Sequence, residues 1–228
     1  AALVQKTMYK GIDSAVYVYA PDGDEVNEHL KRIESYNTRI ENPTAWNEVV
    51  YKGDDFLSRM LAEKKGNVVI LAGNNKEKNN YILQCIREGM NVLADKPMII
   101  SMDDFDALAR SFESASQQGL ILYDIMTERS EITTILQKEI SLDKELFGTL
   151  IRGTADEPAV TKESVHHFFK YVSGQPLKRP AWFFDVTQQG EGLTDVSTHL
   201  VDLIQWECFP EQVIDYKKDI EIVEAKRS

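Results

Sequence analysis

The first half of the chain alternates short apolar segments with amphipathic segments of helical length, and this pattern constrains the fold most. The expected strands are 15–19, 67–72, 91–94 and 120–123. The expected helices between them are 24–35, 54–64, 76–88 and 101–118. Strands and helices that alternate at this spacing predict parallel βαβ units, hence an α/β, doubly wound, Rossmann-like sheet. We expect 67–72, a continuous apolar run, to be buried on both faces.

The alternation ends near residue 125. The next expected elements are a helix over 131–140, a strand over 149–152, an irregular aromatic stretch over 155–192, a helix over 194–206 and an extended segment over 213–223. This mixture predicts a second, α+β domain with a mostly antiparallel sheet. We therefore expect a dinucleotide-binding domain over 1–125 and a substrate-binding domain over 126–228.

The two ends of the chain resemble interior segments. Residues 1–9 read as the tail of a helix without a cap or an initiator methionine. We expect the first strand of the sheet and its glycine-rich loop to precede residue 1, and the second domain to continue past residue 228. Cellular location stays open, with the cytoplasm as the default and export as the alternative.

Composition excludes several classes of partner. A formal charge of −11 argues against nucleic acid or an anionic membrane. No apolar run approaches the roughly 20 residues that span a bilayer. Cys85 and Cys208 show neither disulfide nor CxxC spacing, and the four histidines lack HxxxH or HExxH spacing. We expect no metal.

Residues 91–97, Asn-Val-Leu-Ala-Asp-Lys-Pro, place a charged pair and a proline at the carboxyl end of a parallel strand. Ligands bind at that end in doubly wound folds. Lys96 there can hydrogen-bond a substrate hydroxyl and help a neighbouring base to remove its proton. The alternative is a solvent-facing turn.

Asp195, His199 and Asp202 recur at helical spacing and share one face of the predicted helix. An aspartate can orient a histidine or stabilise its charged form, which suits a general acid or base. The alternative is the polar face of an amphipathic helix.

Residues 178–185, Lys-Arg-Pro-Ala-Trp-Phe-Phe-Asp, follow the pair His166–His167 and combine aromatic rings with polar groups. Such a set suits a sugar, but aromatic residues of this kind more often form core.

Together, "GMNVLADKP" (89–97) and "GEGLTDVSTHLVDL" (190–203) resemble the Glu-Lys-Pro and Asp-x-x-x-His-x-x-Asp signatures of the glucose–fructose oxidoreductase/inositol dehydrogenase (Gfo/Idh/MocA) family. The resemblance implies an NAD(P)-dependent oxidoreductase that acts on a sugar, cyclitol or related polyol. It implies a homo-oligomer that pairs second domains. An NAD-dependent glycoside hydrolase and a non-catalytic ligand-binding or regulatory protein are the alternatives.

The resemblance also implies roles for individual residues. The catalytic residues would be Lys96, His199 and Asp195. The cofactor, NAD or NADP, would contact Asp22, Gly73, Asn74, Asn75, Asp95, Lys96, Pro97 and Trp182. The substrate would contact Arg129, His167, Asp195 and Asp202.

Overall fold

The computed structural model describes residues 11–163, 170–172 and 175–224. In its first half, β1 (Ala15–Ala20) leads through α1 (Asp24–Thr38) to β2 (Asn47–Lys52), which pairs with β1 in parallel. This βαβ unit matches the predicted pattern, but the sequence analysis missed β2. The run Val49-Val50-Tyr51 was its signal, because β-branched and aromatic residues favour strands.

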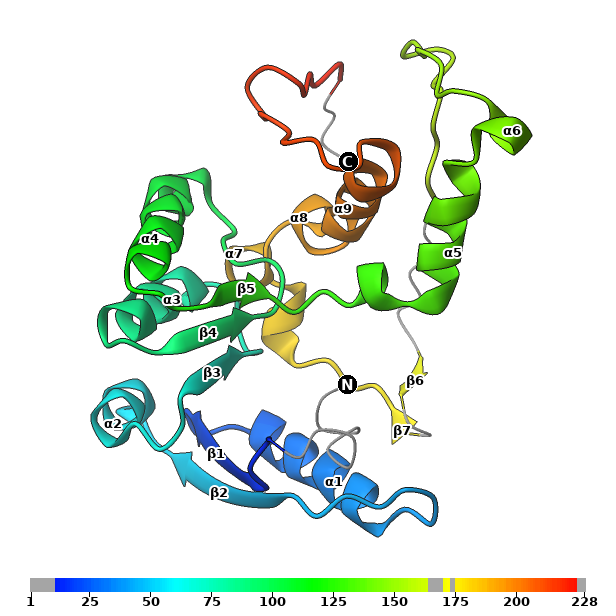
Figure 1. Ribbon diagram of the computed structural model, residues 1–228. Coiled ribbons are helices and arrows are strands. Elements are labelled where there is room, and N and C mark those ends of the chain that lie inside the picture. The colour runs from blue at the N-terminus through cyan, green and yellow to red at the C-terminus, as the bar shows by residue number, and fades with distance from the viewer. Residues whose placement is uncertain (1–10, 164–169, 173–174, 225–228) are drawn as a thin grey trace. The chain divides into compact units, whose positions relative to one another are not determined.

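A second sheet has the strand order β3–β4–β5, with β3 (Val68–Leu71), β4 (Asn91–Ala94) and β5 (Leu122–Asp124). Its strands run in the same direction (Figure 1). The accompanying helices are α2 (Phe56–Glu63), α3 (Lys78–Arg87) and α4 (Phe105–Gln117), the last preceded by the 3-10 turn η2 (Met102–Asp104). This arrangement confirms the predicted α/β class with a parallel, Rossmann-like sheet.

The core of this half is built on α3 and the central strand. On α3, Ile82 lies one helical turn before the adjacent residues Cys85 and Ile86. Each of the three is at most 1 % exposed. On β3 the expectation of two buried faces is wrong. Val69 is buried, whereas its neighbours Val68 and Ile70 are 45 % and 59 % exposed. Because successive residues of a strand face opposite sides, only one face of β3 is covered.

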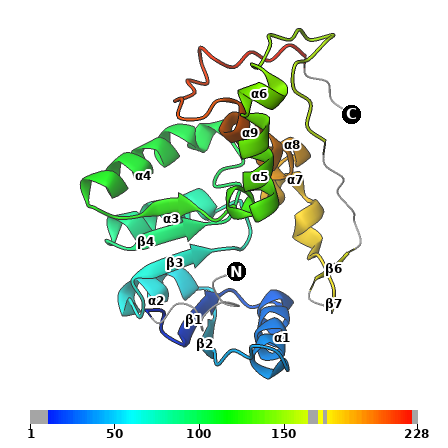
Figure 2. The ribbon, with the colours of Figure 1, turned by 45° about the vertical axis from the view of Figure 1, so that its right-hand side comes forward.

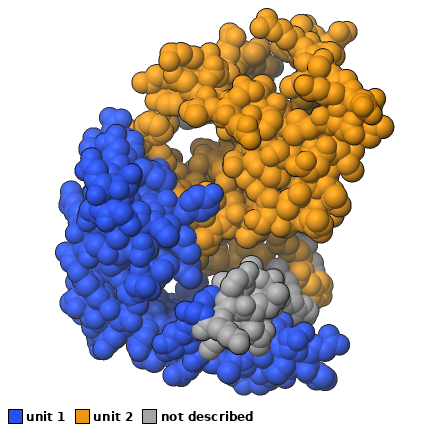
Figure 3. All heavy atoms as spheres, in the orientation of Figure 1, with its two compact units in different colours: residues 1–71, 77–93, 106–123 blue, residues 72–76, 94–105, 124–228 orange. Residues whose placement is uncertain are grey.

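The chain forms two compact units (Figure 3). Unit 1 comprises 1–71, 77–93 and 106–123, and unit 2 comprises 72–76, 94–105 and 124–228. The segments that directly follow β3, β4 and β5 therefore belong to unit 2, in the same compact body as the second half of the chain.

Unit 2 is mainly helical. Its regular elements are η3 (Glu128–Ser130), α5 (Ile132–Ser141), α6 (Lys144–Phe147), β6 (Tyr171–Val172), β7 (Gln175–Pro176), η4 (Ala181–Phe184), α7 (Val186–Gln189), α8 (Gly192–Asp195) and α9 (Ser197–Cys208). Helix α5 lies beside α9 (Figure 1, Figure 2). Strands β6 and β7 form a short antiparallel pair, which is all that the described residues contain of the expected antiparallel sheet.

Three predictions for this half differ from the structure. Residues 149–152 and 213–223 form no strand, and the predicted single helix over 194–206 is divided at Val196 into α8 and α9. A strand needs a partner for its backbone N–H and C=O groups, and neither segment has one among the described residues. Leu150 and Ile151 accordingly remain 54 % and 73 % exposed.

None of the helices in the described ranges combines the length and the apolar character that crossing a bilayer requires.

Candidate active site

The loop after β3 is fastened to the helix α7 by two asparagines. The Asn74 side-chain amide donates to Gln188 Oε1 at 2.9 Å, and that of Asn75 donates to the Gln189 carbonyl at 2.8 Å. Asn75 is only 4 % exposed. The loop that carries Gly73 is thus held against the segment that leads into α8.

Gly190 shapes the turn between α7 and α8, and Asp185 caps the start of α7. Gly190 has φ +94°, a left-handed conformation that favours glycine, and a Cβ there would lie 2.8 Å from Ile100 Cγ2. Asp185 caps α7 by accepting from the Thr187 N–H. Hydrogen bonds from Gln188 and Thr187 lower the pKa of the Asp185 carboxyl.

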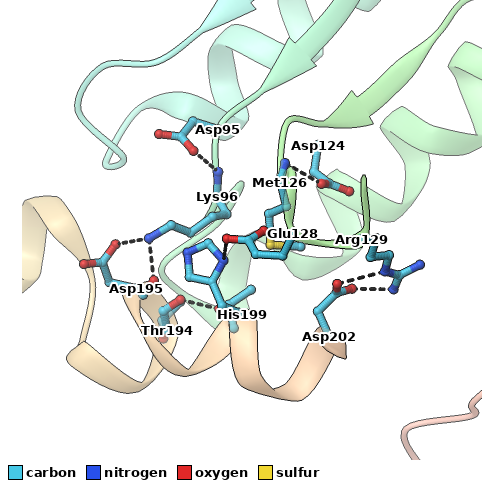
Figure 4. Close-up of polar contacts among 11 residues, drawn as sticks. Asp95, Lys96, Asp124, Met126, Glu128, Arg129, Thr194, Asp195, His199 and Asp202 are labelled. Carbon is cyan, nitrogen blue, oxygen red and sulfur yellow. Dashed lines mark hydrogen bonds and ion pairs between the residues drawn. The ribbon is translucent and has the colours of Figure 1, made fainter. Parts of the chain in front are cut away.

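Lys96 follows β4 and reaches the end of α8. Its Nζ donates to Asp195 Oδ1 at 2.6 Å and also to the Asp195 carbonyl (Figure 4). The two side chains are 19 % and 13 % exposed, so this ion pair is largely removed from water. The next peptide bond, Lys96–Pro97, is cis. The two sequence signatures, about a hundred residues apart, therefore meet through a direct contact.

His199 lies in the first turn of α9 (Figure 4). Its Nδ1 lies 2.8 Å from Glu128 Oε1. The carboxylate is off the N–H direction of the ring, so the contact is an ion-pair contact rather than an aligned hydrogen bond. Sequence analysis missed Glu128, because nothing in the order of residues signals that the turn after β5 returns to α9.

Arg129, the next residue along the chain, binds Asp202 one turn further along α9. Its Nε donates to Asp202 Oδ2 at 2.8 Å and its terminal nitrogen to Oδ1, which makes a two-point fork (Figure 4). Two of the four residues assigned to the substrate on sequence grounds therefore bind each other.

The buried side chain of Glu207 fixes Lys162, another residue of the site. Glu207, 8 % exposed, accepts from Lys162 Nζ at 2.6 Å and from Gln137 Nε2 at 2.9 Å. Burial, with the Glu207 charge nearby, raises the pKa of the adjacent Cys208 thiol. Lys162 therefore presents an ammonium that is already paired.

The segment 178–185 contributes the aromatic side of the site. The guanidinium carbon of Arg179 lies 4.0 Å from the centre of the Phe183 ring. Trp182 and Phe183 pack at a tilt, whereas Phe184 is 65 % exposed. Two of the three aromatic side chains thus face the site, and the third does not enter the core.

These groups surround a pocket of about 610 Å³ that lies wholly within unit 2. Seven of its lining residues had been predicted as site residues: Gly73, Asn75, Asp95, Lys96, Trp182, Asp195 and His199. The lining residues that sequence analysis missed include Glu128, Lys162 and Gln189.

The other predicted residues lie elsewhere. Asn74, Pro97, Arg129 and Asp202 are not among the lining residues. Asp22 follows β1 in unit 1 and is exposed, and His167 lies outside the described residues.

No group of three or more histidine, cysteine or acidic side chains in the described segments is arranged to hold a metal ion.

The pocket lies where doubly wound folds hold their ligands. Gly73 and Asp95 lie just beyond the carboxyl ends of parallel strands, where doubly wound folds bind their ligands. A Cβ at Gly73 would meet nothing within 4 Å, which leaves open space beside the loop.

Two family models match the chain. Residues 19–123 match "Oxidoreductase family, NAD-binding Rossmann fold", and residues 136–228 match "Putative oxidoreductase C terminal domain". The first match confirms the expected nicotinamide dinucleotide cofactor, with NAD as the form named. No curated protein matches the chain.

One solved structure is similar over nearly the whole chain. An oxidoreductase from Parabacteroides merdae ATCC 43184, whose function is likewise inferred, is 59% identical, with a TM-score of 0.90 over 98% of this chain and 51% of its own. The chain thus spans about half the length of that relative. Two more distant structures show the fold alone. GenD2 from gentamicin A biosynthesis, in complex with NAD, is 19% identical, with a TM-score of 0.51 over 85% of this chain and 53% of its own. Levoglucosan dehydrogenase, in complex with NADH and levoglucosan, is 11% identical, with a TM-score of 0.51 over 85% of this chain and 54% of its own.

Proposed function

Because the chain belongs to the Gfo/Idh/MocA oxidoreductase family, we propose that it transfers hydride between NAD(P) and a CH–OH group of a sugar, cyclitol or related polyol. The observation that carries the proposal is the Lys96–Asp195 contact of 2.6 Å at a pocket that His199 also lines. An ammonium and an imidazole beside one pocket can act on one hydroxyl group.

Lys96 supplies the hydrogen-bond donor for the reacting oxygen. An ammonium has three donors, and two of them are used by the Asp195 carboxylate and carbonyl. The third has no acceptor among the described residues and would bind the substrate oxygen, which the positive charge stabilises as its proton leaves. Asp195 thereby fixes the direction of the ammonium and can itself accept from a second substrate hydroxyl.

His199 supplies the base. As the hydroxyl is oxidised, its proton passes to the ring and its carbon gives up a hydride. When bound, the nicotinamide is the hydride acceptor. In the reverse direction the protonated ring returns the proton to the carbonyl oxygen. Both steps need the ring to face the pocket, where His199 is a lining residue.

The proposed cofactor contacts are those of the sequence analysis. Gly73, Asn75, Asp95, Lys96 and Trp182 line the pocket and would contact the nicotinamide half. Asn74 and Pro97, which do not line the pocket, are the remaining proposed cofactor contacts. Asp22, after β1, is the candidate for the adenine ribose, and a carboxylate at that place would favour NAD over NADP.

The proposed substrate contacts are Asp195, His167, Arg129 and Asp202. Among the described members of this set, Asp195 has the strongest support because it lines the pocket. Arg129 and Asp202 bind each other, so a substrate could engage them only by opening that fork.

We also propose the domain boundary near residue 125, a mostly antiparallel sheet in the second domain, and self-association through that domain. The domain boundary is supported by the two family matches, of which one ends at residue 123 and the other begins at residue 136.

Self-association is supported by exposed apolar residues on α5, among them Ile132 and Leu136, which are 67 % and 50 % exposed. Sedimentation analysis that finds only monomers would refute it.

The test of the function is turnover of a polyol panel, followed by NADH absorbance, with Lys96→Ala and His199→Ala. Each variant should lower turnover by roughly 100-fold or more, as expected for a lost acid–base group. His29→Ala and Lys218→Ala, outside the pocket, should retain normal rates. Near-normal rates in both pocket variants would refute the mechanism. Sugar release from glycosides without net NADH would instead identify the glycoside hydrolase.

A further inference from the structure

Glu128 is the one acidic side chain that an ion-pair contact joins to His199 among the described residues. The Oε1–Nδ1 distance is 2.8 Å, and the side chains are 30 % and 26 % exposed. The Nδ1 atom is buried, and no group in the described part of the chain forms an aligned hydrogen bond with it. The carboxylate is therefore the group with which this buried nitrogen interacts.

The backbone fixes Glu128 in this place. The 3-10 turn η3 carries Glu128 and Arg129 as consecutive residues, and they contact His199 and Asp202, which are one turn apart on α9. The Arg129 fork has two hydrogen bonds, so it restrains rotation of η3 against α9. Glu128 is held over His199 by its neighbour.

Several other charged groups in or near the pocket have partners of their own. The Asp195 carboxylate binds Lys96, the Asp202 carboxylate binds Arg129, and Lys162 binds Glu207. Glu163, Lys170 and Arg179 also line the pocket, but no ion pair joins them to His199 among the described residues. Among the described residues, Glu128 is therefore the charged group in direct contact with Nδ1.

At 2.8 Å an unprotonated ring nitrogen would bring its partial negative charge into contact with the carboxylate oxygen, which is unfavourable even when the two groups are not aligned. The neutral ring must then carry its proton on Nδ1, which leaves the lone pair on Nε2. We infer that Glu128 is a positioning residue that holds His199 in the tautomer whose Nε2 accepts the substrate proton. The catalytic part of this inference rests on the proposed function, but the tautomer itself does not.

The direct test is long-range ¹H–¹⁵N NMR of the histidine rings in the whole chain at neutral pH. The His199 signals are identified by their loss in His199→Asn. In the wild type they should show the Nδ1-protonated ring. In Glu128→Gln they should move to the Nε2-protonated pattern or to a mixture, because a neutral amide can donate as well as accept. Glu128→Asp keeps the charge but shortens the reach, and should give an intermediate pattern.

The chain provides a matched control. His29 Nε2 lies 2.7 Å from Glu48 Oε1 in unit 1, a pair of the same chemistry at another place. Glu48→Gln should alter the His29 signals and leave those of His199 unchanged, and Glu128→Gln should do the reverse. An Nε2-protonated His199 in the wild type, or an unchanged pattern in Glu128→Gln, would overturn the inference.

Kinetics separates this inference from the proposed function. On an accepted polyol, Glu128→Gln should lower kcat roughly 10- to 100-fold with little change in KM, and should add nothing in a His199→Ala background. Full turnover in Glu128→Gln, together with inactive Lys96→Ala and His199→Ala, would refute the role of Glu128 and keep the function. If His199 shows the predicted tautomer but the protein turns over no polyol, the role of Glu128 in fixing the tautomer is kept and the proposed function is refuted.

Discussion

The Lys96–Asp195 contact should make a measurable contribution to the stability of unit 2. Removing one partner of a buried ion pair costs about 3–5 kcal/mol, whereas an exposed pair contributes about 0–1 kcal/mol. At 19 % and 13 % exposure, this pair is near the buried limit. We expect Lys96→Met to lower the free energy of unfolding by about 2–3 kcal/mol, because it leaves the carboxylate without its cation.

Asp195→Asn should cost less, about 1–2 kcal/mol, because the backbone carbonyl of residue 195 still accepts from Lys96. The double variant Lys96→Met/Asp195→Asn removes both charges, so no buried charge is left without a partner. The loss should therefore fall short of the sum of the single losses by about 1 kcal/mol or more.

The assay is urea unfolding followed by tryptophan fluorescence in a Trp46→Phe background. Trp46 belongs to unit 1, so the remaining Trp182 and Trp206 report on unit 2. Lys218→Met is the matched control, because Lys218 is 79 % exposed and its pair with Asp215 at 2.7 Å should contribute under about 0.5 kcal/mol. Additive losses in the Lys96 and Asp195 variants would show that the contact carries no coupling energy.

Two further predictions concern buried groups elsewhere. Burial raises the pKa of the Cys85 thiol from 9.0 to about 11. As the pH rises, the unfolded chain therefore loses this proton at a lower pH than the folded chain does. The free energy of unfolding should fall by about 2–3 kcal/mol between pH 9 and pH 11. Cys85→Ala should flatten the decline measured by urea unfolding, and an unchanged slope would contradict the assignment. Tyr19, whose pKa is raised to about 12 by burial and by Glu63, adds to the decline only above pH 10. Asn75→Ala should lower the stability of unit 2 by about 1–3 kcal/mol, because it leaves the buried Gln189 carbonyl without a donor, whereas Asn74→Ala at the part-buried neighbour should cost less. Equal thermal shifts for these two asparagine variants would count against that reasoning.

Local patterns predicted much of the first half. Each predicted strand and helix from residue 15 to 123 corresponds to an element of the structure, because hydrophobic periodicity follows the faces that are buried. The missed strand β2 lies where Asn47, Glu48 and Lys52 interrupt the apolar run.

The second half was predicted less well because its structure depends on partners distant in sequence. Apolar residues such as Leu150 and Ile151 suggest a strand, but a strand forms only where another backbone supplies hydrogen bonds. Sequence motifs located Lys96, Asp195 and His199. They could not find Glu128, because a contact across 71 positions has no local signature, nor the Arg129–Asp202 fork, which bridges a similar separation.

The two asparagines after β3 have a consequence for the order of events at the site. Because Asn75 is tied to the Gln189 carbonyl, the loop at Gly73 cannot move away from the pocket unless that bond breaks or the residues before Gly192 move with it. A ligand that settles on the loop therefore also restricts the segment that presents Asp195. If a ligand on the loop raises the affinity for a ligand at Asp195 by some factor, then a ligand bound to Asp195 raises the affinity at the loop by that same factor. Occupancy of either half of the pocket should thus favour occupancy of the other.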